Sequence, residues 1–414
     1  MRDKLLSRAL FTRDFSLLFS GQAISVFGDG LFTIALSFAV LEITGTAGLG
    51  LVLAVGALPM VGLILVGGVW ADRLERRRIM LAADAARVVI QLVLAALVIS
   101  GNVELWHLLV LQALYGTAQA FFGPASTGII PQILADDELL RSANGVLGAN
   151  RSTMFVLGAA AGGVLVNAFG SGQAIALDAV TFALSAICLS RLRTHPAAVS
   201  AADRESFIHE LKEGFREVRR HRWLWMTLIN AFLFLMLYVA PVNVLGPLIA
   251  KDDLGGARSW GFIEAAFGLG MALGGITAAS IRFRRPVFIA AVLLLVTCVT
   301  PLLLAAAAPV PVIASSFAVE GYAAGLFVAV WEGELQRQIP AEMLSRVSAW
   351  DWMGSLAGMP IGFVVGGVVA EAIGTDETLV GVAICAFGLA VWMILSPTMR
   401  SIGMRGPELQ PAEA

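Results

Sequence analysis

Long apolar runs separated by short charged segments constrain this chain more than any other feature. Hydrophobic residues make up 58% of its 414 residues and charged residues only 14%, whereas a soluble domain has about 25% charged residues. A run of about 20 apolar residues crosses a bilayer as a helix, because no water is present there to hydrogen-bond the backbone. We predict twelve such helices, at residues 15–41, 47–70, 79–100, 105–127, 143–168, 174–192, 223–249, 260–281, 286–307, 311–333, 347–371 and 378–398.

The distribution of lysine and arginine predicts the orientation of these helices. Of the 28 basic residues, 24 fall at the chain ends or in loops on one side of the membrane, and the opposite loops hold only Lys251 and Arg258. Positive charge is retained on the cytoplasmic side. We therefore expect both termini in the cytoplasm and a multi-pass protein of the plasma or inner membrane.

The chain also contains an internal repeat. The stretch Gly158–Gly170 matches Gly362–Gly374 at an offset of 204 residues, with the pattern Gly-x-x-x-Gly-Gly in both copies. A repeat of this length indicates two related structural units. We predict an all-α membrane protein with two pseudo-symmetric six-helix bundles, at residues 1–193 and 223–400, a linker at 194–222 and a short cytoplasmic tail at 401–414.

The linker is the largest predicted segment outside the membrane. Its apolar residues recur at helical spacing with charges between them, which is typical of an amphipathic helix at an interface. A solvated helix that only tethers the two bundles is the simpler alternative. The apolar positions are Phe207, Leu211, Phe215 and Val218.

Several motifs resemble the major facilitator superfamily. The pattern Gly68-x-x-x-Asp72-Arg73-x-x-Arg76-Arg77 is similar to the signature between helices 2 and 3 of that superfamily. Other stretches resemble the branch that contains macrolide-type drug exporters and siderophore exporters. These are residues 25–29, 178–182, 213–223, 336–340 and 346–351.

The sequence departs from the drug–proton antiporters of this superfamily at two motifs. Helix 4 commonly carries an arginine where this chain has Gln112, and the helix 5 signature has a proline where this chain has Ala159. The first departure argues against a proton relay through a helix 4 arginine. The glycines of the helix 5 signature remain, and small residues let helices approach closely. We expect helix packing at Gly158, Gly162, Gly163, Gly362, Gly366 and Gly367.

Two acidic residues are predicted deep in the membrane. Asp29 lies near the middle of helix 1, and Glu320 lies at a similar depth in helix 10. A charge at the bilayer centre costs about 2.5–3.5 kcal/mol on insertion scales, and loss of hydration favours the neutral carboxyl. Such a group can be neutral when dry and ionised when wet, as a proton carrier requires. The alternative is a structural carboxylate that is satisfied by neighbouring groups.

The resemblance implies that helices 1, 4, 7 and 10 line a central cavity. Each of them has a polar or aromatic stripe in this chain, which suits amphipathic or cationic molecules, although ordinary helix packing also explains any single aromatic residue. The predicted cavity residues are Gln22, Ser25, Thr33, Gln112, Tyr115, Gln119, Asn230, Phe234, Tyr238, Phe327 and Trp331.

Charged residues toward the cytoplasmic side favour a gate. The resemblance places Asp72 beside the start of helix 11, where Asp351 could pair with Arg73 or Arg76. A purely topological role is the alternative for the hairpin arginines. The predicted gate residues are Asp72, Arg73, Arg76, Arg77, Asp84, Arg87, Arg141, Arg151, Arg346 and Asp351.

These observations favour a transporter over an enzyme. The sequence contains no Gly-x-x-x-x-Gly-Lys phosphate loop, and its four histidines form no metal or nucleophile pattern. We expect no metal and no cofactor, with a proton gradient as the energy source. The partners are protons, lipid and a small-molecule substrate but no nucleic acid, and we expect a monomer.

The leading hypothesis is proton-coupled efflux of small amphipathic molecules by alternating access between two bundles. An importer or uniporter of the same fold is one alternative, and an exporter of siderophores or natural products is another. A non-transporting membrane sensor or scaffold is the alternative from a different class of protein.

Overall fold

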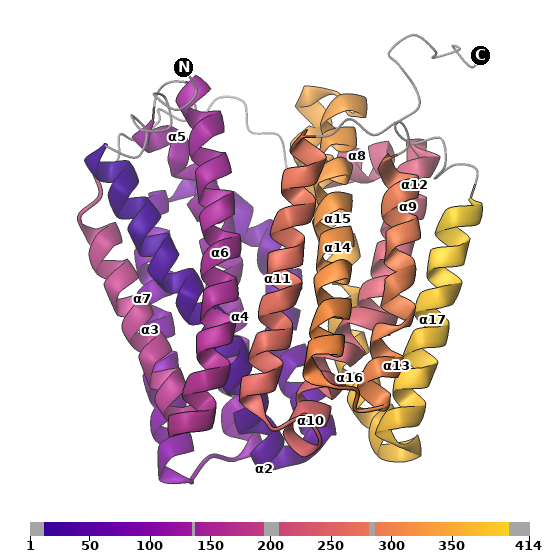
Figure 1. Cartoon of the computed structure of the whole chain (residues 1–414). Helices are drawn as coiled ribbons and strands as arrows, with labels where there is room; N and C mark the ends of the chain where they lie inside the picture. Colours follow the sequence, from indigo (N-terminus) through magenta and orange to yellow (C-terminus); the bar gives the residue numbers. More distant parts are fainter. Residues whose placement is uncertain (1–11, 135–136, 194–206, 281–285, 397–414) are drawn as a thin grey trace.

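The computed structural model describes residues 12–134, 137–193, 207–280 and 286–396, and every regular element in these ranges is a helix (Figure 1). Within these ranges, the following side chains lie outside the described set: those of residues 64–73, 137, 138, 141, 207–211, 286, 287, 290, 291, 341, 342 and 345. The N-terminal half consists of α2 (Arg13–Arg73), α3 (Arg76–Ser100), α4 (Leu105–Gly128), α5 (Ile130–Ile133), α6 (Asp137–Phe169) and α7 (Ser171–Ser190).

The C-terminal half follows the linker helix α8 (Phe207–Arg220). Three of its predicted spans are interrupted helices. The span at 223–249 contains a π-helical turn, and the span at 286–307 contains a short 3₁₀ segment. In the span at 347–371, a single residue separates two helices. The elements are α9 (Arg222–Phe234), η2 (Leu235–Val239), α10 (Ala240–Asp252), α11 (Ala257–Ser280), α12 (Pro286–Leu293), η3 (Leu294–Cys298), α13 (Thr300–Ala305), α14 (Val310–Gln338), α15 (Ala341–Leu356), α16 (Gly358–Ile373) and α17 (Thr375–Leu395).

Nine helices in the described ranges are long and apolar enough to cross a bilayer. The first of them, Arg13–Leu63, has 51 residues, far more than the roughly 20 that one crossing needs. Gly45 divides it with φ 72° and ψ −162°, a backbone conformation that glycine adopts without a steric penalty. The two arms of α2 cover the helices predicted at 15–41 and 47–70, and a kink at Gly45 replaces the predicted loop.

Each half has its own packed core of helices. In the N-terminal half, α2 packs against α4, α6 and α7, while in the C-terminal half α11 packs against α14 and α10 packs against α16. One buried apolar cluster then joins the halves, because it contains Leu31 and Phe38 of α2 together with Leu245 of α10 and Phe363 of α16. Burial of apolar surface from water or lipid headgroups into this cluster favours the assembled pair of halves.

The largest described contacts between the halves are those of α6 with α11 and of α2 with α16, and α2 also contacts α10, α11 and α15. The backbone of Gly163 faces Gly261, and the backbone amide of Ala47 donates to Oε1 of Glu371 over 2.9 Å. Gly163 lies near the end of α6, and Ala47 lies just after the kink of α2 at Gly45. Both of these parts of the chain are at the bottom of Figure 1, whereas α2 begins and α17 ends at the top.

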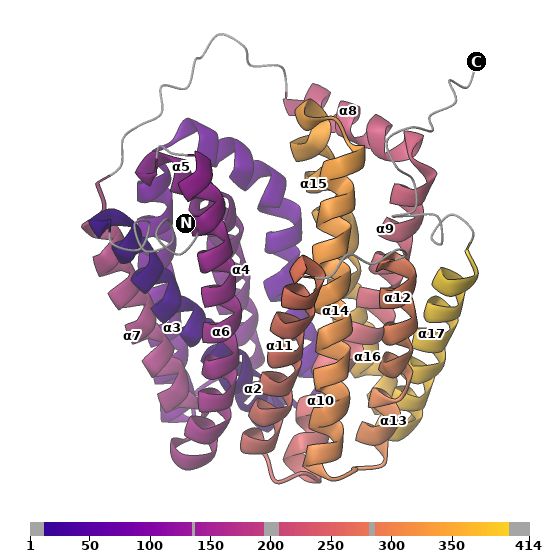
Figure 2. The ribbon, with the colours of Figure 1, turned by 45° about the horizontal axis from the view of Figure 1, so that its top comes forward.

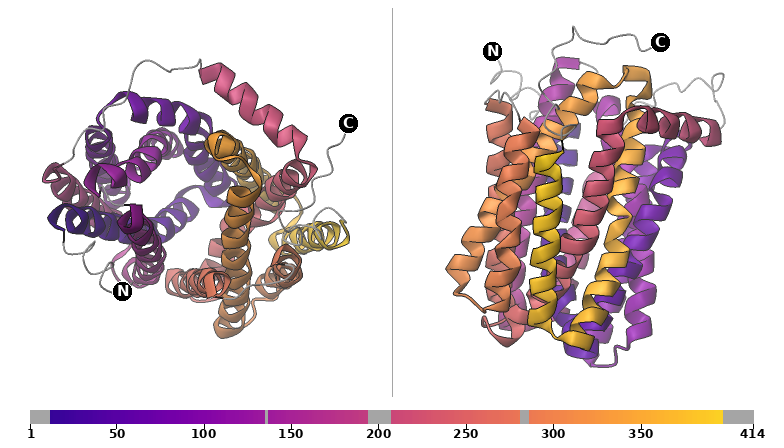
Figure 3. Two further views of the ribbon diagram at one scale, coloured as in Figure 1. Left: turned by 90° about the horizontal axis from the view of Figure 1, so that it is seen from above. Right: turned by 90° about the vertical axis from the view of Figure 1, so that its right-hand side faces the viewer.

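The linker helix α8 lies across the ends of the membrane-spanning helices, beside α15 (Figures 2 and 3). Glu213 forms an ion pair with Arg346 of α15, and the ring centroids of Phe215 and Trp350 are 5.0 Å apart. α8 is therefore docked on the C-terminal half by these contacts. Residues 194–206 of the predicted linker and the predicted tail at 401–414 lie outside the described residues.

Candidate functional site

A cavity of about 440 Å³ lies within the N-terminal half. Its walls come from α2, α3, α4 and α6, and they combine polar, charged and aromatic side chains. The lining residues are Gln22, Ser25, Val26, Asp29, Phe32, Thr33, Leu36, Leu53, Arg87, Tyr115, Gln119, Phe122, Gly123, Ser126, Thr127, Arg151 and Phe155.

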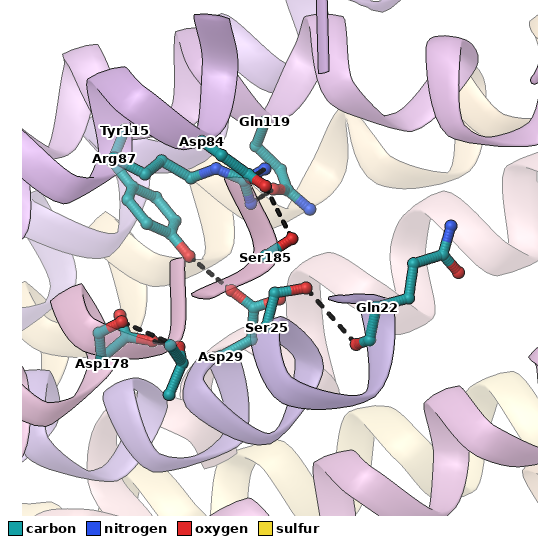
Figure 4. Close-up of polar contacts among 10 residues, drawn as sticks. Gln22, Ser25, Asp29, Asp84, Arg87, Tyr115, Gln119, Asp178 and Ser185 are labelled. Carbon is teal, nitrogen blue, oxygen red and sulfur yellow. Dashed lines mark hydrogen bonds and ion pairs between the residues drawn. The ribbon is translucent and has the colours of Figure 1, made fainter. Parts of the chain in front are cut away.

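Asp29 lies in this wall, in the middle of the first arm of α2. The hydroxyl of Tyr115 on α4 donates to its Oδ1 over 2.7 Å (Figure 4). Two glycines flank Asp29 and let neighbouring helices approach. A side chain at Gly28 would collide with Thr181 of α7, and one at Gly30 would meet the backbone of α6. The local sequence therefore seats Asp29 among three other helices, deep in the bundle.

Arg87 and Asp84 of α3 form a buried ion pair beside Asp29. Nη2 of Arg87 lies 2.7 Å from Oδ1 of Asp84, and both residues are at most 1% exposed. Ser185 of α7 donates to the second carboxylate oxygen of Asp84 over 2.7 Å, and Nη1 of Arg87 donates to Gln119 over 2.9 Å (Figure 4). The pair is held from three helices, which restricts the guanidinium to one position.

Aromatic rings complete the surroundings of Arg87. Its guanidinium carbon lies 4.3 Å from the ring centroid of Phe122 and 4.4 Å from that of Phe182. Rings at this distance attract a cation through their quadrupole. Phe122 also lines the cavity. Phe122 was not among the predicted cavity residues, although its position three residues after Gln119 on α4 places it on the same helix face, and the same holds for Phe155, four residues after Arg151.

Asp178 of α7 is a third aspartate in this region. It is 0% exposed, and its carboxylate accepts from Gln91 of α3 over 2.6 Å and from Thr181 over 3.1 Å. The guanidinium of Arg87 interacts electrostatically with Asp29, Asp84 and Asp178, and that of Arg151 interacts with Asp29.

The C-terminal half contains a second buried carboxylate. Oε2 of Glu320 on α14 accepts from the hydroxyl of Tyr238 over 2.6 Å, and both residues are buried. Tyr238 lies in the π-helical turn η2, and its ring stacks on Phe234 with centroids 5.0 Å apart. Glu320, Tyr238 and Phe234 therefore form one group, which is separate from the residues that line the cavity.

The remaining predicted cavity residues have other neighbours. The side chain of Gln112 lies against Gly56 on the second arm of α2, and Asn230 donates to the carbonyl of Leu389 over 3.3 Å. Phe327 and Trp331 are stacked with centroids 6.2 Å apart. Of the eleven predicted cavity residues, the structure brings Gln22, Ser25, Thr33, Tyr115 and Gln119 together around the cavity.

The predicted gate residues divide into several groups. Arg87 and Arg151 line the cavity, and Asp84 pairs with Arg87 beside it. Arg77 donates to the carbonyls of Leu189, over 2.9 Å, and Ser190 at the end of α7, where basic groups complement the helix dipole. The guanidinium of Arg76 packs against Gly128 at the end of α4. The side chains of Asp72, Arg73 and Arg141 lie outside the described set.

On the C-terminal side, the two predicted gate residues have partners within that half. Arg346 pairs with Glu213 of α8, and Oδ2 of Asp351 accepts from Nε1 of Trp331 over 3.1 Å. The ring of Trp331 in turn lies 5.4 Å from that of Trp223. The described partner of Asp351 is thus a tryptophan of α14, and the predicted pairing with Arg73 falls on a side chain outside the described set.

The six predicted packing glycines lie at close helix contacts of two kinds. Side chains at Gly158 and Gly162 would meet the backbone of α2, and side chains at Gly362 and Gly366 would meet Met236 and Pro241. These four contacts join helices of the same half. The last glycine of each pattern instead faces the other half, as Gly163 lies against α11 and Gly367 lies against Ala47 of α2.

A bundle of apolar helices that encloses a charged cavity has the architecture of a membrane transporter. The chain belongs to the transmembrane secretion effector family of the major facilitator superfamily, whose model matches residues 9–406. It is therefore a multi-pass membrane transporter and not an enzyme.

Curated relatives match the chain along almost its whole length. Macrolide efflux protein A of Streptococcus pyogenes is 24% identical over 392 residues, which cover 93% of each chain. The multidrug efflux pump Tap of Mycolicibacterium fortuitum is 26% identical over 394 residues, which cover 91% of this chain and 94% of the relative. A crystal structure of the nucleoside transporter NupG has the same fold, with a TM-score of 0.74 and 14% identity over 92% of this chain and 98% of that chain.

Proposed function

We propose that this protein exports small amphipathic molecules in exchange for protons by alternating access. Two whole-length relatives are named as efflux proteins, one for macrolides and one for multiple drugs. The cavity supports a similar range of substrates, because Phe32, Phe122 and Phe155 offer apolar contacts beside Gln22 and Gln119. A pocket with aromatic walls and a few polar groups accommodates amphipathic ligands of varied shape.

The topology in this proposal has twelve crossings with both termini in the cytoplasm. Nine helices qualify as spans by length and composition. The kinked α2 supplies two crossings instead of one, and α4 and the α12–η3–α13 segment supply the remaining two. The concentration of 24 of the 28 basic residues at one side supports the orientation.

Alternating access is supported by where the halves touch. The contacts of Gly163 with α11 and of Gly367 with α2 are on the side opposite to the start of α2 and the end of α17. In the proposed topology that side is extracellular. The structure then corresponds to the state in which the extracellular side is closed, and rocking of the halves about the site would open it.

The observation that carries the proposal is the position of Asp29. It is an ionisable group in the middle of an apolar helix, it lines the cavity, and its described hydrogen-bond partner is the neutral hydroxyl of Tyr115. An intramembrane carboxyl group of this kind marks a proton or substrate pathway. A proton and a cationic group of the substrate would compete for Asp29, so binding of one favours release of the other, which is the requirement for exchange.

Asp29→Asn tests this mechanism. We expect the variant to insert and to bind substrate but to lose substrate-driven proton movement in everted vesicles, because asparagine cannot take up and release a proton. Asp253→Asn, in the exposed segment after α10, is the matched control and should behave like the wild type. Unchanged proton movement in Asp29→Asn would remove Asp29 from the mechanism.

The same vesicles test the direction of transport. An imposed pH gradient that is acidic inside everted vesicles should drive substrate inward, which corresponds to export from the cell. Substrate that moves together with protons would favour the importer instead, and flux that ignores the gradient would favour the uniporter. Measured binding with no flux under any gradient would favour the sensor or scaffold.

A further inference from the structure

Each half of the molecule contains a hydrogen-bonded pair of a tyrosine and a carboxylate, which is half-buried at the cavity in the N-terminal half and buried in the C-terminal half. Tyr115 donates to Asp29 over 2.7 Å in the N-terminal half, and Tyr238 donates to Glu320 over 2.6 Å in the C-terminal half. The chain has only three tyrosines, and these pairs use two of them. The third, Tyr322, lies on α14 two residues beyond Glu320.

The two pairs occupy equivalent positions in the internal repeat. Asp29 comes sixteen residues after the start of α2 at Arg13, and Tyr238 comes sixteen residues after the start of α9 at Arg222. Tyr115 comes ten residues after the start of α4, and Glu320 comes ten residues after the start of α14. The acid and the phenol have therefore exchanged places. The acid is on the first helix of the N-terminal half but on the fourth helix of the C-terminal half.

Neighbouring glycines support this register. Gly116 follows Tyr115, and its backbone lies against the carbonyl of Gly56 on the second arm of α2. Gly321 follows Glu320, and its backbone lies against the carbonyl of Phe267 on α11. In both halves, the fourth helix is thus seated on the second helix directly beside the site. The repeat preserves the backbone arrangement of the site while the two side chains are interchanged.

We infer that Tyr115 and Tyr238 are positioning residues of two proton-binding sites, one in each half, related by the internal repeat. This inference rests on the proposed proton coupling. A phenol hydroxyl that donates to a carboxylate oxygen stabilises the ionised acid and fixes the oxygen that remains free. When a proton is taken up, a hydronium ion transfers it to that free oxygen, so an O–H bond forms on the carboxyl group and one breaks in the hydronium, which leaves as water. Release of the proton to water reverses this step. The tyrosine stays neutral throughout.

The surroundings of the two acids differ in charge. The titratable and charged groups that face Asp29 are Tyr115, Arg87 and Arg151, with Asp84 and Asp178 further round the cluster. Those that face Glu320 among the described residues are Tyr238 and Glu264, with Cys298 beside Tyr238. Two guanidinium groups can stabilise ionised Asp29, whereas Glu320 depends on hydroxyl groups. The loss of a phenol hydroxyl should therefore destabilise the ionised acid more at Glu320 than at Asp29.

Tyr115→Phe and Tyr238→Phe test the inference. Each removes only the hydroxyl and keeps the ring, which contacts Phe32 in the case of Tyr115 and stacks on Phe234 in the case of Tyr238, so the fold should persist. We expect the midpoint of the transport–pH profile to move to higher pH, by about one pH unit in Tyr238→Phe and by less in Tyr115→Phe, since the ionised acid loses a charge-assisted hydrogen bond. Tyr322→Phe is the matched control and should leave the profile unchanged.

Two further outcomes separate this inference from the proposed function. Adding Glu320→Gln to Tyr238→Phe should abolish the shift, because no titrating acid remains beside the lost hydroxyl. A wild-type protein that couples to protons, together with Tyr→Phe profiles that superimpose on it, would overturn the positioning role alone. A wild-type protein that moves no protons would overturn the proposed function and this inference together.

Discussion

At the scale of residues, the ion pair of Arg87 and Asp84 is a buried and extensively hydrogen-bonded part of the candidate site. Both charges are buried, and Ser185 and Gln119 hydrogen-bond them from two other helices. A buried charge is tolerated when it is paired and hydrogen-bonded, but it is costly when its partner is removed. The pair therefore holds α3, α4 and α7 together next to the cavity. It stabilises the fold only when both members are present.

Substitution of one or both members measures this dependence. Arg87→Gln should destabilise the protein by about 3–5 kcal/mol, because Asp84 is left buried without a counter-charge. The double variant Asp84→Asn/Arg87→Gln removes both charges and should be more stable than Arg87→Gln. Thermal unfolding in detergent is the measurement. Equal melting temperatures for the single and double variants would contradict this account of the pair.

At the scale of elements, the glycines of the Gly-x-x-x-Gly-Gly pattern make two different kinds of helix contact. The first two glycines of each copy seat α6 or α16 on the first helix of its own half, and the third glycine faces the other half. A Cβ atom at Gly163 would lie 2.5 Å from the carbonyl oxygen of Ala257 and 3.1 Å from Cα of Gly261. The third glycine thus affects the contact between the halves and leaves the packing within each half unaffected.

Gly163→Val should therefore disfavour closure of the proposed extracellular side. Overpacking costs about 1–3 kcal/mol, so the population open to the outside should rise roughly tenfold. Labelling of Ser25→Cys in the cavity by an impermeant thiol reagent, with the three native cysteines replaced, would report this as faster reaction from outside. Gly275→Val, whose Cβ would have no neighbour within 4 Å, is the control on α11. Equal labelling rates in the two variants would argue against a gate at Gly163.

At the scale of the whole molecule, two kinds of connection join the halves. One is the covalent linker, whose helix α8 belongs to the C-terminal half through Glu213, Phe215 and their partners on α15. The other is the set of direct helix contacts, of which the largest are between α6 and α11 and between α2 and α16. The second kind buries residues of both halves in one apolar cluster. Association of the halves should therefore survive loss of the covalent link.

Proteolysis of the folded protein tests this expectation. A protease site inserted ahead of α8 should allow cleavage without separation, so that the two fragments elute together in mild detergent and still exchange substrate for protons. A site between α8 and α9 would instead detach α8 from α9 while the contacts of α8 with α15 remain. Fragments that separate after cleavage ahead of α8 would show that the linker, and not the interface, holds the molecule together.

Much of this protein was predictable from its sequence. Apolar runs require membrane helices, because an unsatisfied backbone in lipid is too costly, and the repeated glycine pattern predicted two related halves. The family and the membrane location were both confirmed. The position of Asp29 in the middle of a long apolar helix also followed from the sequence. The role of Gly45 did not, because glycine is common in membrane helices and its φ angle depends on context.

Only the tertiary structure decided which side chains meet. Helical spacing gives the face on which Gln112, Tyr115 and Gln119 lie, but it cannot tell which neighbouring helix covers each turn. For this reason Gln112 lies against Gly56, whereas Tyr115 reaches Asp29. Arg87, predicted at a gate, lies in the wall of the cavity because α3 packs between α4 and α7. The sequence by itself therefore determined the helices, their repeat and the position of each charge along its helix. Helix packing determined the partners, because a partner depends on the rotation and approach of two elements distant in the chain.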